Sequence, residues 1–102
     1  MELKKVAVAG TLESSDAMVT IEPLEEGEGI DFELDSVVIH QFGEQIKSVV
    51  FETLNRLDVK DAYVKVVDKG ALDCTLKARV ECAVYRACDK NVNLPWGGAI
   101  RS

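Results

Sequence analysis

Residues 30–57 read IDFELDSVVIHQFGEQIKSVVFETLNRL, and their hydrophobic period changes once along the way. The first five residues alternate strictly between apolar and acidic side chains, which predicts a half-buried β-strand. From residue 39 onward the apolar positions recur at helical spacing, which predicts an amphipathic helix. The apolar face of that helix is formed by Ile39, Phe42, Ile46, Val49, Val50, Thr53, Leu54 and Leu57. A strand and a helix that each carry one apolar face bury it by packing in two layers.

Three further segments have the composition of strands. Residues 6–9 (VAVA) and 18–21 (MVTI) flank the polar sequence ESSD at 13–16. Because turn-forming residues between two β-rich runs favour a hairpin, we expect a hairpin-like loop there. Pro23 closes the second run, since proline is disfavoured within a central strand. Residues 62–67 predict a third strand, which ends at the breaking sequence DKG.

Residues 72–87 fit either an alternating strand or a helical stripe. Their length favours the helix, because strands rarely exceed about 10 residues, and Ala, Leu, Lys and Arg are good helix formers. We therefore predict an α+β fold, a two-layer sandwich with a mainly antiparallel sheet of about four strands and two helices packed on one face. Residues 1–90 form the predicted domain, and residues 91–102 form a C-terminal tail whose Leu94 and Trp96 dock either on this domain or on a partner.

Charge and composition exclude several classes of function. The chain has 102 residues, which favours one domain, and a formal net charge of −6. Without a basic cluster, binding to a nucleic-acid backbone is disfavoured. No run approaches the roughly 18 apolar residues that cross a bilayer. Cys74, Cys82 and Cys88 lack metal-ligand or redox spacing, so we expect idle thiols and a soluble, cytoplasmic protein.

A search for catalytic residues finds little. His40 is the one histidine, and its predicted helix position favours a solvated side chain. The carboxylates are not spaced as metal ligands, and no glycine-rich loop precedes a helix. Ser14 lies in the predicted loop, and a serine without a neighbouring base can still accept a phosphodiester when another enzyme activates it. From the residues alone, an ordinary turn is the favoured interpretation, and such an attachment site is the alternative.

A second serine also has to be weighed. Asp35-Ser36-Val37 is faintly similar to the Asp-Ser-Leu attachment motif of four-helix acyl carrier proteins. The predicted strands contradict that all-helical fold. Ser36 is therefore interpreted as a helix cap.

Four ordered blocks resemble the citrate lyase acyl carrier protein family, the gamma chain of that enzyme. They are AVAGTLESSD at residues 7–16, QFG at 41–43, DKGALDC with KARVE at 68–81, and LPW at 94–96. Together they span nearly the whole chain. Any one of them alone would be weak, but four in order are specific.

The resemblance implies a non-catalytic carrier subunit. By position, Ser14 would bear 2'-(5''-phosphoribosyl)-3'-dephospho-CoA through a phosphodiester, attached by a dedicated transferase. The thiol of that group would carry acetyl and citryl thioesters while the alpha and beta chains of citrate lyase convert citrate to acetate and oxaloacetate. Ser15 stands where the family often has glycine.

Two acidic residues flank the expected attachment point. Glu13 and Asp16 would keep a phosphodiester from folding back and would mark the site for the transferase, or else merely favour a turn. The nearest alternative function is the carrier subunit of malonate decarboxylase. An alternative from another class is a small-molecule-binding regulatory domain, which requires a ligand pocket and an unmodified Ser14.

Overall fold

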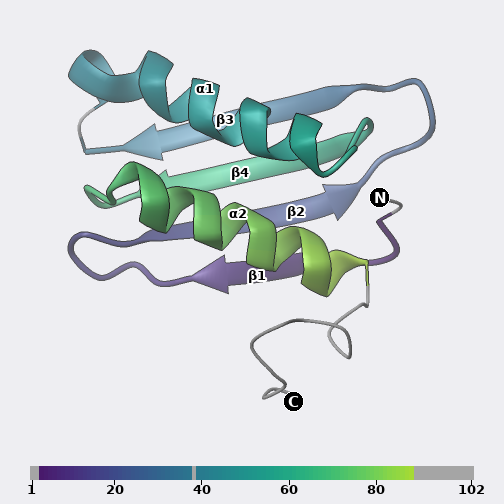
Figure 1. Ribbon diagram of the computed structural model, residues 1–102, viewed down its shortest axis with the longest axis horizontal. Coiled ribbons are helices and arrows are strands. Elements are labelled where there is room, and N and C mark those ends of the chain that lie inside the picture. The colour runs from purple at the N-terminus through teal and green to yellow at the C-terminus, as the bar shows by residue number, and fades with distance from the viewer. Residues whose placement is uncertain (1–2, 38, 89–102) are drawn as a thin grey trace.

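The computed structural model describes residues 3–37 and 39–88, and within these residues a sheet is covered by helices on one face (Figure 1). The side chains of residues 39 and 40, the predicted tail and its boundary at residue 90 lie outside the described residues. The elements in chain order are β1 (Ala7–Gly10), β2 (Ala17–Pro23), β3 (Ile30–Ser36), α1 (Ile39–Arg56), β4 (Ala62–Asp68) and α2 (Asp73–Ala87).

The strands lie side by side in the order β1-β2-β4-β3. β2 is antiparallel to both β1 and β4, whereas β3 runs parallel to β4. Parallel neighbours cannot be joined by a tight turn, and α1 supplies the crossover between them. The predicted mainly antiparallel α+β sandwich is confirmed, with one parallel pair at the edge.

Both helices lie on the same face of the sheet, and their apolar stripes form the core with the inward side chains of the strands (Figure 1). β2 and β4 alternate between buried and half-buried residues, as expected of strands covered on one face. The helix predicted over residues 72–87 is also confirmed. The fully buried large side chains include Val19, Ile21, Val64 and Val66 from the sheet, Val50 and Leu54 from α1, and Leu76, Val80 and Val84 from α2.

The predicted stripe of α1 is buried only in part. Ile46, Val50 and Leu54 are buried, but Phe42 is 49% exposed near the beginning of the helix. Among the described residues, no helix is both long and apolar enough to span a membrane.

Gly10 ends β1 at the point where the chain enters the loop to β2. Its φ is +96°, in the left-handed region, and a Cβ added there would lie 1.8 Å from the carbonyl oxygen of Ala17 and 3.1 Å from Cδ of Arg79. Glycine is therefore required at position 10 for two reasons: its backbone conformation is strained for other residues, and there is no space for a Cβ atom.

We expect Gly10→Ala to lower the free energy of unfolding by more than about 2 kcal/mol, because the backbone carbonyl of Ala17 cannot move without breaking the hairpin. Gly27→Ala is the matched control, since Gly27 has a φ of +93° but open space around its Cβ position. It should cost only about 1 kcal/mol, from conformation alone. Urea unfolding of both variants measures the difference, and equal losses would contradict the steric argument.

Candidate functional site

The predicted hairpin loop between β1 and β2 is confirmed, and its tip is a tight turn over residues 13–16. The amide of Asp16 donates to the carbonyl of Glu13 at 3.1 Å, which places Ser14 and Ser15 at the two central positions. Ser15 has a φ of +66°, as the third residue of a type II turn requires. Ser14 precedes it at the corner of the turn and is exposed.

This turn is held against the segment that connects β4 to α2. The amide of Ser15 donates to the carbonyl of Lys69 at 2.9 Å, and the amide of Lys69 donates to the carbonyl of Asp16 at 2.9 Å. Two backbone hydrogen bonds thus fix the exposed corner to the end of a central strand. Ser14 is therefore exposed on a turn that is held in place by the fold.

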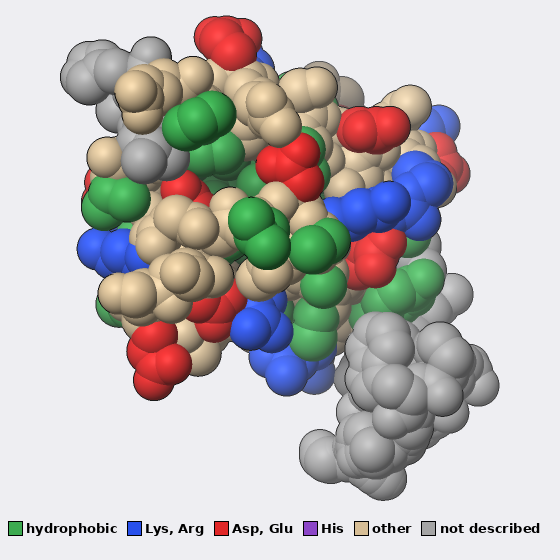
Figure 2. Space-filling model, turned by 60° about the vertical axis from the view of Figure 1, so that its left-hand side comes forward, with side chains coloured by type: hydrophobic (Ala, Val, Ile, Leu, Met, Phe, Trp, Pro, Cys, Tyr) green, Lys and Arg blue, Asp and Glu red, His purple; other side chains and the backbone are tan. Residues whose placement is uncertain are grey.

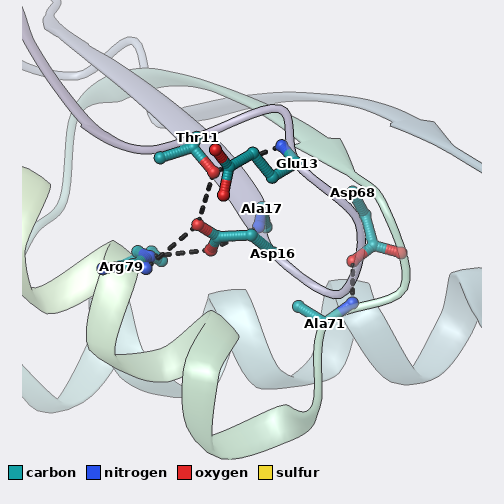
Figure 3. A network of polar contacts seen from close by, with 7 residues as sticks. All are labelled: Thr11, Glu13, Asp16, Ala17, Asp68, Ala71 and Arg79. Carbon is teal, nitrogen blue, oxygen red and sulfur yellow. Dashed lines mark hydrogen bonds and ion pairs between the residues drawn. The ribbon is translucent and has the colours of Figure 1, made fainter.

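Asp16 connects the turn to α2 (Figure 3). Nε and one terminal nitrogen of Arg79 donate to its two carboxylate oxygens at 2.9 and 3.0 Å, and the Thr11 hydroxyl donates at 2.7 Å. The amide of Ala17 donates to the same carboxylate at 2.7 Å. The Arg79 and Thr11 hydrogen bonds hold the pKa of Asp16 far below its usual range. The paired, planar geometry makes this a strong ion pair.

The two acidic residues that flank Ser14 therefore differ. The carboxylate of Asp16 is only 13% exposed and is engaged by Arg79, so it offers little free negative charge to a partner. Glu13 is exposed, with its amide bonded to the Thr11 hydroxyl at 3.2 Å. Of the two roles considered for Asp16, shaping the turn is the one its contacts support.

Ser36 lies in a different setting from Ser14. It is the last residue of β3, half-buried, and its hydroxyl donates to the carboxylate of Asp68 at 2.9 Å. Asp68 is buried at the end of β4 and also accepts from the amide of Ala71 at 3.0 Å. This hydroxyl is committed within the fold, so Ser14 is the better placed of the two serines for attachment. The cap predicted from Asp35 or Ser36 involves residue 38, outside the described residues, and stays a prediction.

The remaining candidates do not assemble into a site. Cys74 is exposed, Cys82 half-buried and Cys88 buried, and no disulfide joins these three described residues. Among the described residues, no group of three or more potential ligands could hold a metal ion. The side chain of His40 lies outside them. Sequence reasoning missed the roles of Arg79 and Asp68, whose only signal was their place within the family blocks.

The Asp16 ion pair makes a pH-dependent contribution to stability. Because the pKa of Asp16 is lowered in the folded state, its contribution is complete above the unfolded value near 4 and is lost as the pH falls toward the folded value. At pH 7 we expect Asp16→Asn to lower the free energy of unfolding by about 1–2 kcal/mol. Urea titrations from pH 7 to pH 2 should show this deficit shrinking below pH 5. Glu13→Gln is the control, expected to stay within about 0.5 kcal/mol of the unaltered protein.

The left-handed conformation of Ser15 generates a second prediction. Since glycine adopts a positive φ without steric cost, Ser15→Gly should raise the free energy of unfolding by about 0.5–1 kcal/mol. Ser14→Gly is the matched comparison. Because Ser14 has no positive φ, this variant should be less stable than the unaltered protein or equally stable. Thermal unfolding of the two variants provides the measurement, and a destabilised Ser15→Gly would show that the serine side chain supports the turn.

Comparisons with known proteins show the family of the chain. A family model described as the malonate decarboxylase delta subunit (MdcD), an acyl carrier protein family, matches residues 4–87. The citrate lyase acyl carrier protein of Vibrio cholerae is 53% identical over 96 residues, covering 94% of this chain and 96% of that protein. That of Fusobacterium nucleatum is 56% identical over 91 residues, covering 89% and 96%.

A solved structure shares the fold. A chain of a Pseudomonas malonate decarboxylase hetero-tetramer in complex with malonate superposes with a TM-score of 0.68 at 19% identity, covering 82% of this chain and 84% of that chain. The relatives from Vibrio cholerae, Streptococcus mutans and Fusobacterium nucleatum, each more than half identical to this chain, are all named citrate lyase acyl carrier protein. The chain therefore belongs to the citrate lyase acyl carrier protein family, whose members are non-catalytic carriers.

Proposed function

We propose that this protein is the acyl carrier subunit of a citrate lyase, with 2'-(5''-phosphoribosyl)-3'-dephospho-CoA attached through a phosphodiester to the hydroxyl of Ser14. The observation that carries the proposal is the position of Ser14, exposed at the corner of a turn that is clamped to β4 and α2. When attached, the group supplies a thiol that holds acetyl and citryl groups as thioesters.

The residues around Ser14 fit an acceptor that does not activate itself. Among the contacts described, the side chains that hold the loop are Thr11, Asp16 and Arg79, and their hydrogen bonds are directed at one another. No described base contacts the Ser14 hydroxyl. A transferase would therefore take the proton as the serine oxygen forms its bond to phosphorus and the leaving group departs from the donor.

The chain's contribution to turnover is to hold and position the attached group. A thiol on a long tether reaches two active sites at high effective concentration without leaving the complex. Lys69 and Arg79 fix the turn that carries Ser14. The point at which the tether begins is therefore restricted, while the far end of the tether stays free. The expected partners are the alpha and beta chains of citrate lyase and the loading transferase, in the cytoplasm of a citrate-fermenting cell, with neither nucleic acid nor membrane involved.

A malonate decarboxylase carrier is the second candidate, because the matching family model and the solved structure bear that enzyme's name. The relatives above 50% identity favour citrate lyase. Purification of the tagged chain from its host distinguishes the two, since each enzyme has its own large subunits.

Peptide mapping of protein from a citrate-fermenting host tests the attachment. We expect a coenzyme-like added mass on the peptide that contains residues 11–16. Ser14→Ala should remove the added mass and reduce citrate cleavage by the reconstituted complex to background. Ser15→Ala is the matched control, one residue away in the same turn, and should retain both.

Other outcomes would contradict the proposal. Full citrate cleavage by complexes that contain Ser14→Ala would exclude Ser14 as the attachment point. The same added mass on Ser36 would favour the ordinary acyl carrier motif. Protein that stays unmodified in an actively fermenting host would favour the regulatory domain instead.

A further inference from the structure

A groove of about 420 Å³ lies between α1 and the segment that leads into α2. Its apolar wall is formed by Phe42, Ile46, Ala71 and Leu72, and two of these are unusually exposed, Phe42 at 49% and Leu72 at 70%. In Figure 2, which brings this end of the molecule forward, hydrophobic side chains lie at the surface beside acidic ones. The volume lies within the range of small-molecule sites.

The groove is adjacent to the Ser14 turn. Asp68 and Gly70 line it, and between them is Lys69, whose backbone holds Ser15 and Asp16. Ser14 and Gly70 are each one residue from the Ser15–Lys69 hydrogen bond, so their Cα atoms lie within about 13 Å of each other. A pantetheine chain is about as long as four extended residues, roughly 14 Å. A group attached at Ser14 that includes pantetheine can therefore reach the groove.

We propose that the uncharged distal end of the group carried by Ser14, its pantetheine chain with a free or acetylated thiol, rests in this groove when no partner is engaged. The inference rests on the proposed function. It adds to that function a binding site for the group on the carrier's own surface.

The charges at the groove select which part of the group enters. Its lining contains the carboxylates of Asp68 and Asp73 and no lysine or arginine. Phosphates are therefore disfavoured, whereas methyl and methylene groups can cover Phe42 and Leu72. Gln45 bridges the two helices by donating to Asp73 at 2.7 Å, and its carbonyl oxygen can accept from an amide of pantetheine.

Covalent attachment makes weak binding sufficient. A flexible tether of this length keeps its distal end near the carrier at an effective concentration on the order of millimolar, so a groove with a dissociation constant near that value is occupied about half the time. Such a site holds the arm without competing with the active sites of partner chains. It also removes two exposed apolar side chains from water between visits.

Nuclear magnetic resonance of the full-length carrier tests the inference. Amide spectra are compared before and after loading, with complete attachment to Ser14 verified by mass. We expect chemical-shift changes at residues 42–46 and 70–73, beyond those at the attachment turn. Changes confined to residues 10–17 and 68–69 would overturn the groove while leaving attachment at Ser14 intact. Absence of the added mass would instead refute the proposed function.

Thiol reactivity gives an independent readout. Leu72→Glu and Phe42→Glu place a charge in the groove. Because the groove is occupied about half the time, emptying it should let the thiol of the loaded carrier be alkylated up to about twofold faster. Alkylation is measured as the mass of the peptide that contains Ser14, so that the cysteines do not interfere. Val8→Glu is the control, because Val8 is 42% exposed on the opposite face of the sheet. Equal rates in all variants would overturn the proposal.

A partner-docking role for the same face predicts a different result. Phe42→Glu would then weaken assembly with the large chains, while loading would leave the amides of residues 42–46 unshifted. That combination would also overturn the proposal.

Discussion

The carboxylate of Asp16 is the contact that joins the hairpin loop to the remainder of the fold. It receives Arg79 from α2 and Thr11 from the opposite side of the loop, while its own backbone carbonyl receives the amide of Lys69. The Arg79 stem crosses the position where Gly10 lacks a side chain. One residue therefore sets the distance between the turn, the end of β4 and the middle of α2, and with it the position of Ser14.

Most of the fold is predictable because each element has its own hydrophobic period. The alternation in residues 30–34 and the helical spacing that follows reflect which side chains meet the core, and the structure buries Ile46, Val50 and Leu54 accordingly. The parallel pairing of β3 with β4 cannot be predicted from hydrophobic periods alone. Strand order depends on how α1 crosses the sheet, and a local period contains no information on that crossing.

The site is only partly readable from the sequence. Turn chemistry identifies an exposed loop at Ser14, but the ion pair that holds it joins residues 63 positions apart. Nothing local distinguishes Arg79 from the other cations of α2. Phe42 shows that an apolar period does not guarantee burial, because it fits the apolar stripe of α1 and yet is half exposed near the beginning of that helix.

Under the proposed function, the chain must combine a fixed attachment point with a mobile arm, and its structure would allow this by separating the two tasks. The turn is fixed by backbone bonds to Lys69, so it need not reorganise when a partner approaches. The serine at its corner is left in solvent, where an enzyme can reach it. Catalytic groups would add nothing, because the chemistry takes place wherever the thiol arrives. Under the further inference proposed above, the carrier would also control where the arm rests, because a groove one residue from Lys69 would hold the arm weakly and release it at little energetic cost.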